Sequence, residues 1–224
     1  MGSSAMIELL ILFAIAAFVL YRLKSVIGTR TGYEARPDHV RPHDTGPAGA
    51  EPRKGVSDAT RADIAEHHAD LDESSREAVA GMVEAEPDFT LETFLEGARS
   101  AYEMILMAYE EGDRQTLRDL LAPDVYQAFE SVIAKREAEG LKVEARFIGI
   151  RESRVVSAAF DPETREADIT ARFVGEVITA VRDPENRIVE GDPNEIRKQK
   201  DMWTFSRVMG SSSPNWLLTA TGGD

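Results

Sequence analysis

The sequence predicts an α+β domain, in which helices pack on one face of an antiparallel sheet, behind a single N-terminal membrane-spanning helix. Three observations predict it. An uncharged apolar run lies near the start, apolar residues recur with helical spacing between about residues 89 and 140, and strand alternation follows Gly140. Helices first and strands afterwards, joined by hairpin-length connections, are typical of α+β domains.

The charge is large, negative and unevenly distributed. The 224-residue chain has no cysteine and a formal net charge of −14. Residues 1–54 hold seven basic and five acidic residues, whereas the remainder holds 19 basic and 35 acidic residues, a net charge of −16. Such a domain repels phosphate backbones and anionic lipid, so general nucleic-acid binding is excluded. The lack of cysteine excludes disulfides, thiolate metal sites and cysteine nucleophiles, and we expect no cofactor or metal.

The apolar run is long enough for a membrane anchor. Residues 9–21, LLILFAIAAFVLY, carry no charge, and the hydrophobic stretch of about 18 residues reaches about 27 Å as a helix. Tyr21, Arg22 and Lys24 suit the membrane interface. The expected anchor, within residues 1–24, comprises Leu9, Leu10, Ile11, Leu12, Phe13, Ile15, Phe18, Val19, Leu20, Tyr21, Arg22 and Lys24.

Two other interpretations of this run are weaker. A cleaved signal peptide needs a basic segment before the apolar run and a small-residue cleavage site after it, and the sequence has neither. A buried core helix would be followed at once by a long polar linker with nothing to cover it. Because Arg22, Lys24 and Arg30 follow the run and no basic residue precedes it, the C-terminal bulk is expected in the cytoplasm. Met6 is a credible native start.

A linker and a helical arm are expected between the anchor and the folded domain. Residues 25–57 are rich in proline and glycine and predict a flexible tether, whose histidines we interpret as solvated. Residues 58–85 predict a helix with a weak apolar stripe that includes Leu71, Val79 and Met82. This helix is expected to be either a polar, partly detached element or an amphipathic arm that docks on a partner or a membrane.

The folded domain, residues 86–224, begins with three helices. Thr90 predicts the N-cap of a helix with an apolar stripe that ends at Gly112, and Phe89 and Phe94 predict a hydrophobic staple at its start. Asp113 predicts the cap of a short helix. Pro123 suits the first turn of a third helix, which stops at Gly140.

Strands follow Gly140. Residues 168–177 alternate between apolar and polar side chains, as a half-buried strand does. Residues 143–156, 202–208 and 216–221 predict further strands, and Asp161-Pro162, Asp183-Pro184 and residues 211–215 predict turns. The alternation places Asp168 opposite Phe173, in solvent, and places Asp201 on the same face as Trp203.

No catalytic or phosphate-binding motif is present, and all four histidines precede Glu86. An enzyme would therefore need a carboxylate or tyrosine of perturbed pKa. Asp201 is the better candidate, although a hydrogen-bonded structural role is favoured for it. Large side chains on late strands either pack the core or line a pocket or partner groove. The pocket or partner-groove candidates are Tyr102, Phe173, Asp201, Trp203, Phe205 and Trp216.

Several segments, in order, resemble one known family. They are PDFTLETFLEGARSAYEMILMAYEEGDRQTLRDLLAPDVYQAFESVI (87–133), FIGI (147–150), ITARFVGEV (169–177), DMWTFSR (201–207) and PNWLLTAT (214–221). They resemble the C-terminal domain of mitochondrial inner-membrane translocase subunit forty-four and, more closely, its bacterial membrane-anchored adaptor homologues. The resemblance covers about residues 86–224.

The resemblance implies a cone-like, nuclear-transport-factor-2-type fold with a hydrophobic pocket, on the inner membrane of a bacterium. It also implies an adaptor of protein transport or assembly, with transport or chaperone proteins as partners and a hydrophobic ligand or lipid as a further candidate for the pocket. The sequence shows no counterpart of the long charged N-terminal region through which the mitochondrial member contacts its chaperone and channel, so the resemblance does not carry over those particular partners. The alternative is a small-molecule binder or a carboxylate-based enzyme, by analogy of fold alone.

The anchor yields a first prediction. Since a spanning helix is held by hydrophobic burial rather than by charge, washing cell envelopes with alkaline carbonate should leave the intact chain in the membrane pellet. A peripheral protein washed in parallel is the control. Release of the intact chain into the supernatant would contradict the anchor.

Overall fold

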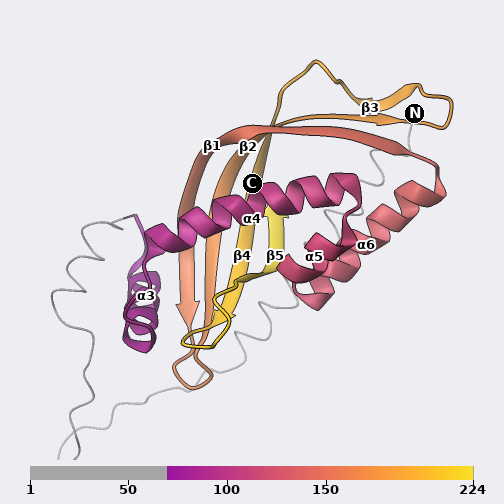
Figure 1. The fold of residues 1–224 in the computed structure, drawn as a ribbon. Helices are drawn as coiled ribbons and strands as arrows, with labels where there is room; N and C mark the ends of the chain where they lie inside the picture. Colours follow the sequence, from indigo (N-terminus) through magenta and orange to yellow (C-terminus); the bar gives the residue numbers. More distant parts are fainter. Residues whose placement is uncertain (1–69, 224) are drawn as a thin grey trace, which may run out of the picture. The chain divides into compact units, whose positions relative to one another are not determined.

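The computed structural model describes residues 70–223, which form four helices and five strands (Figure 1). The helices are α3 (Glu73–Ala85), α4 (Leu91–Glu111), α5 (Arg114–Leu120) and α6 (Pro123–Ala138). The strands are β1 (Lys142–Phe160), β2 (Glu166–Arg182), β3 (Ile188–Gly191), β4 (Arg197–Val208) and β5 (Leu217–Gly223). The expected anchor and tether lie outside the described residues. Within residues 70–223, no helix combines the length and apolar character that crossing a membrane requires.

Helices α4, α5 and α6 begin and end where the sequence predicts, because their capping groups are in place. Helix α3 begins only at Glu73, after the N-cap Asp72, and not within a helix continuous from residue 58. The hydroxyl of Thr90 accepts a hydrogen bond from the Thr93 amide at 3.1 Å, and Gly112 ends α4 with a left-handed φ of 72°. Asp113 caps α5 by accepting from the amides of Gln115 and Thr116. Pro123 occupies the first turn of α6, where its missing N–H costs nothing.

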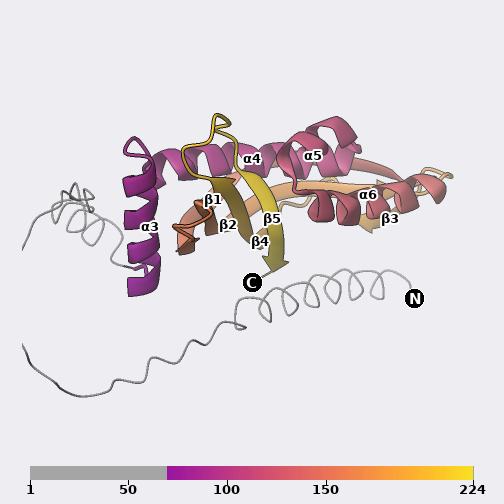
Figure 2. The same cartoon turned by 90° about the horizontal axis from the view of Figure 1, so that it is seen from below.

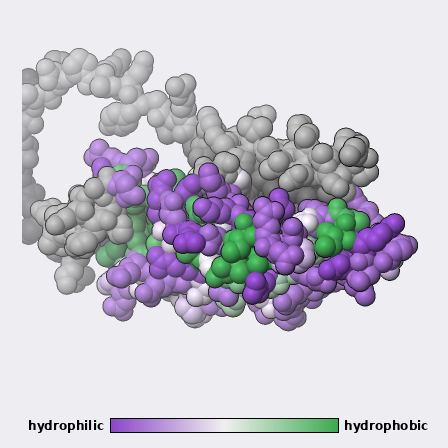
Figure 3. Space-filling model, turned by 90° about the horizontal axis from the view of Figure 1, so that it is seen from above, coloured by the Kyte–Doolittle hydropathy of each residue, from purple (hydrophilic) through white to green (hydrophobic). Residues whose placement is uncertain are grey.

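The strands form one antiparallel sheet in the order β1-β2-β4-β5, with β3 paired to β2. Figures 1 and 2 show α4 running across one face of the curved sheet, with α3 near one end of α4 and α5 and α6 near the other. The predicted α+β class, with helices on an antiparallel sheet, is therefore present. The side seen in Figure 3 is mostly hydrophilic, and its hydrophobic side chains gather in separate patches.

The core lies between α4 and the sheet. On β2 the side chains of Ile169, Ala171 and Phe173 are fully buried, as the alternation predicts. The ring of Tyr102, from the middle of α4, stacks on Phe173 with centroids 4.6 Å apart. Beside this stack, Gly175 allows the β2 backbone to approach the tyrosine closely. This contact fixes the height of α4 above the sheet.

Three expectations need correction. Helix α3 does not stand apart: Val79 and Met82 are buried in the core, and the hydroxyl of Ser75 accepts a hydrogen bond from the Ala158 amide of β1 at 3.1 Å. The short strand β3 was not predicted, because all four of its residues are exposed and show no alternation. Asp168 lies on the face opposite Phe173, as expected, but it is half-buried and accepts a hydrogen bond from Ser206.

The close approach at Gly175 yields a stability prediction. A Cβ there would lie 2.7 Å from the Tyr102 hydroxyl oxygen and 3.0 Å from its Cε1. Gly175→Ala should therefore lower the free energy of unfolding by about 1–3 kcal/mol, the cost of overpacking a core. Chemical denaturation of the full chain in detergent micelles measures this change.

Gly97, on the exposed side of α4, is the matched control. No atom lies within 4 Å of a Cβ added there, so Gly97→Ala should stabilise the helix by about 0.5–1 kcal/mol. In a Tyr102→Phe background, which removes the nearest clashing atom, Gly175→Ala should cost less than in the wild type. Equal costs in both backgrounds would show that the tyrosine hydroxyl is not the obstacle.

Candidate protein-binding groove

An open groove lies between α4, the end of α5 and the loop that joins β4 to β5. Its volume is about 540 Å³. Helix α4 contributes a line of small side chains, Gly97, Ala98 and Ala101, which recur with helical spacing and leave the surface hollow. Met104, 46% exposed, lies at the end of this line. We call this feature the aromatic groove, after the rings described next.

The ring of Trp216 is central to the aromatic side of the groove. Its centroid lies 4.9 Å from that of Phe94, edge to face, and 6.0 Å from that of Phe89. Phe94 in turn meets Phe205 of β4 at 6.0 Å. The two residues predicted as a staple thus both pack on Trp216, across more than 120 residues of sequence. Each aromatic contact adds about 0.5–1.5 kcal/mol to simple area burial and orients the rings.

A partly buried ion pair fixes the loop that carries Trp216. The Arg207 guanidinium lies over the Trp216 ring, 5.2 Å from its centroid, and donates to the Glu86 carboxylate at 2.6 Å. The same carboxylate oxygen accepts from the Gly210 amide at 2.8 Å. The hydrogen bond from Arg207 holds the pKa of the Glu86 carboxyl below its ordinary value. Since the Arg207 side chain is only 7% exposed, the ion pair is partly shielded from salt, and it ties the end of α3, where Glu86 is the C-cap, to the end of β4.

The rim of the groove is acidic. Asp88 and Asp119 line it together with Glu86, while Arg207 is the single basic residue in the lining. Apolar side chains can enter the floor, where burial of each aliphatic side chain yields about 1.5–3 kcal/mol. The arrangement can therefore bind an apolar segment, and the rim favours neutral or basic flanking residues over acidic ones.

A second polar feature lies deeper, under α4. The Tyr102 hydroxyl donates to Asp201 Oδ2 at 2.6 Å, and the Gln199 amide donates to Oδ1 at 3.2 Å. Burial raises the pKa of the Asp201 carboxyl, and burial together with the neighbouring carboxylate raises the pKa of the Tyr102 phenol. Both carboxylate oxygens are thus used in structural hydrogen bonds. Asp201 is not among the residues that line the aromatic groove.

The structure separates the six candidate residues into two groups. Phe205 and Trp216 line the aromatic groove. The other four lie together under α4, where Tyr102, Phe173 and Trp203 are at most 3% exposed and surround the Asp201 hydrogen bonds. Sequence reasoning missed the hollow made by Gly97, Ala98 and Ala101, although their spacing on one predicted helix was a usable signal. It also missed the pairing of Glu86 with Arg207, for which the sequence holds no signal.

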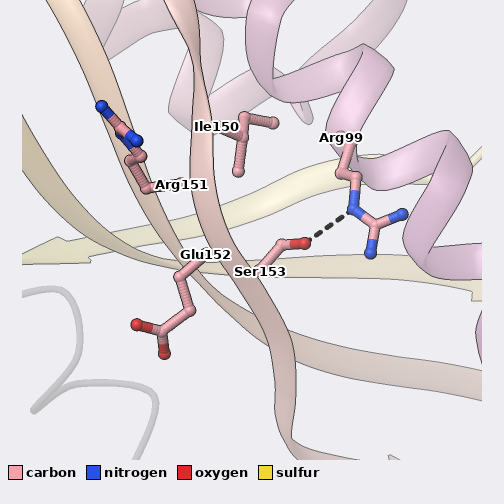
Figure 4. A pocket seen from close by; sticks show the side chains of 5 residues that line it. All are labelled: Arg99, Ile150, Arg151, Glu152 and Ser153. Carbon is pink, nitrogen blue, oxygen red and sulfur yellow. Dashed lines mark hydrogen bonds between the residues drawn. The ribbon is translucent and has the colours of Figure 1, made fainter.

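A smaller, polar hollow lies at the edge strand β1 (Figure 4). Its volume is about 460 Å³, and Arg99, from α4, donates from Nε to the Ser153 hydroxyl at 2.6 Å. Arg151 points away from this contact and pairs with Glu176 at 2.8 Å. Across residues 70–223, no group of three or more histidine, aspartate and glutamate side chains is placed to hold a metal ion.

These features define an α+β domain whose helices pack on a curved antiparallel sheet and leave an aromatic groove open beside the longest helix. The chain belongs to the Tim44-like domain family, because the model of that family matches residues 75–223.

Among solved structures, the intermembrane space region of the chloroplast protein ARC6 is similar at 14% sequence identity and a TM-score of 0.40. The match covers 58% of this chain and 95% of that one. A comparison with curated proteins finds no match.

The Tyr102–Asp201 pair yields a pH prediction. Because burial raises the folded-state pKa of Asp201 above its ordinary value of 3.8, the folded state favours the protonated form. This contribution to stability is complete below that ordinary value and is lost as the pH rises through the raised pKa. Asp201→Asn removes the titrating group. The free energy of unfolding of this variant, relative to that of the wild type, should therefore be higher at pH 7 than at pH 4. Urea denaturation at both pH values measures the difference.

Asp168→Asn, on the opposite face of the sheet, is the control for the loss of one carboxylate. A stability difference between wild type and Asp201→Asn that does not change with pH would contradict the raised pKa.

Proposed function

We propose that this chain is a membrane-anchored adaptor of protein transport or membrane-protein assembly, which binds segments of partner proteins in the aromatic groove on the cytoplasmic face. Membership of the Tim44-like domain family supports a transport role. The uncharged run at residues 9–21 and the basic residues that follow it support the anchor and the orientation.

The aromatic groove is the observation that carries the proposal. It is lined by small residues on one side and rings on the other, and its volume falls within the range of about 300–1,000 Å³ that ligand sites occupy. The ion pair between Arg207 and Glu86 holds Trp216 in position before a partner arrives, so little ordering entropy remains to be lost on binding. Aromatic anchors in a preformed hollow are typical of the centres of protein interfaces.

The tether suits an adaptor. If residues 25–57 behave as a flexible chain, the root-mean-square distance between their ends is about 30 Å. Such a tether confines the domain to a thin layer beside the membrane and raises its effective concentration there to the order of millimolar. A modest affinity in the groove is then sufficient for capture of segments that emerge at the same surface.

The enzymatic alternative gains no support from Asp201. Its two oxygens accept from Tyr102 and Gln199, and it lies outside the lining of the aromatic groove. A general acid or base needs a proton path to a bound substrate, and this carboxylate faces its own core.

Filling the groove tests the proposal. Gly97→Leu places an apolar side chain in the open hollow, where no atom lies within 4 Å of the new Cβ, so the fold is retained. Crosslinking in membranes, followed by purification of the chain, should recover about tenfold less partner protein from this variant than from the wild type, because the partner's side chains are sterically excluded.

Gln127→Leu, at an exposed position on α6 away from the groove, is the matched control and should retain the crosslinks. Trp216→Ala should reproduce the loss by removing the aromatic anchor. If Gly97→Leu and Trp216→Ala both crosslink as the wild type does, the groove is not the binding site.

A further inference from the structure

The face of the sheet turned away from the helices has a charge opposite to that of the domain. Strand register places side chains on this outer face: Arg154 of β1 is level with Arg172 of β2, and Lys200 and Lys198 of β4 are level with Val174 and Glu176 of β2. The middle of this face, formed by residues 146–154 of β1, 168–176 of β2 and 198–206 of β4, carries six basic and three acidic residues, namely Arg146, Arg151, Arg154, Arg172, Lys198 and Lys200 against Glu152, Asp168 and Glu176. Towards the strand ends the same register adds Lys142 and Arg182 against Glu144 and Glu166, so the net charge of the face is +3 in both counts.

The acidic residues in the middle of the outer face are already engaged. Glu152 pairs with Arg172 at 2.8 Å and with Arg154 at 3.5 Å, and Glu176 pairs with Arg151. Asp168 accepts from Ser206. Three exposed cations, Arg146, Lys198 and Lys200, have no carboxylate within salt-bridge distance among residues 70–223.

The helical layer is strongly acidic by contrast. Residues 73–139 hold 16 acidic and six basic residues, a net charge of −10. The domain therefore presents one negative side and one positive face. Arg154 and Arg172, which are directly opposed, share the Glu152 carboxylate, so the uncompensated charge in the middle of the face lies at Arg146, Lys198 and Lys200.

We infer that the outer face of the sheet is a second interaction surface, which binds an extended acidic segment of a partner protein. Lys198 and Lys200 are two residues apart on one strand, so their side chains repeat at about 6.8 Å. An extended chain with Asp or Glu at alternate positions repeats its carboxylates at the same spacing. Arg146, two strands away, lies roughly 10 Å to the side and can meet a further carboxylate.

A protein segment fits this face better than an anionic membrane does. A bilayer surface would bring its charge close to the whole domain, whose helical layer carries −10, and the carboxylates of the face would also be repelled. A narrow acidic segment along β4 meets Lys198 and Lys200, while Glu176, which is level with Lys198 on β2, is buried and paired with Arg151. Its binding should depend strongly on salt, since the contacts are exposed.

The test uses the full chain in phosphatidylcholine nanodiscs and a fluorescent ten-residue peptide of alternating Glu and Thr. We expect binding that weakens between 50 and 300 mM salt, and no binding of a matched Gln/Thr peptide. Lys200→Glu should weaken binding about three- to tenfold, and Lys200→Gln by less, since reversal adds repulsion to the lost attraction. Lys135→Glu, an equal charge change at an exposed position of α6, should change binding less than twofold.

The outcomes separate this surface from the aromatic groove and from a membrane. Gly97→Leu should bind the peptide normally, so a failure of the groove proposal leaves this one intact. Equal losses for Lys200→Glu and Lys135→Glu would overturn it, since net charge alone would then explain binding. An alternative outcome is that the chain sediments with vesicles that contain 30% phosphatidylglycerol and fails to bind the peptide. If Lys200→Glu then abolishes this sedimentation, the surface binds lipid and the proposal is overturned. Circular dichroism checks that each variant is folded.

Discussion

The contact between Tyr102 and β2 sets the distance between α4 and the sheet, and the rest of the domain depends on that distance. The tyrosine ring stacks on Phe173, Gly175 gives it room, and its hydroxyl is bound by Asp201. A buried hydroxyl without an acceptor would lower the stability of the fold by about 1–3 kcal/mol. By accepting the hydrogen bond from Tyr102, the half-buried Asp201 carboxylate helps to hold α4 in its position. The aromatic groove runs along the same helix, and its shape is therefore set by this contact.

The groove and the outer face of the sheet follow two different physical rules. In the groove, small side chains on α4 leave a hollow, which is bordered by Phe89, Phe94 and Phe205 and by Trp216 of the β4–β5 loop. Binding there depends on removal of apolar surface from water. On the outer face, uncompensated lysine and arginine side chains favour an acidic partner through charge, which is weaker per contact and more sensitive to salt. The two proposed surfaces would allow the domain to hold two partners at once.

The sequence predicted local structure accurately where a single residue determines it. Thr90, Gly112 and Asp113 mark the ends of helices as predicted, because capping is decided within a few residues. The alternation along β2 predicted that Ile169, Ala171 and Phe173 are buried, because one side of an antiparallel strand meets the core. Val174 and Glu176, which the alternation placed on the solvent side, are buried as well, so the half-buried pattern holds only for the first part of the predicted strand. The same reasoning missed β3, whose exposed residues show no alternation, and placed α3 partly outside a domain in which Val79 and Met82 are buried.

From the sequence by itself came the α+β class, the helix boundaries, the asymmetric charge, the apolar N-terminal run and the resemblance to a transport family, because each is written in neighbouring residues or in composition. Only the tertiary structure decided which aromatic residues face a groove. Trp203 lies on β4 and Trp216 directly precedes β5, and both are large apolar residues. Yet Trp203 is buried under α4, whereas Trp216 borders the groove. The difference comes from contacts between distant segments, such as Glu86 with Arg207, and no local pattern encodes them.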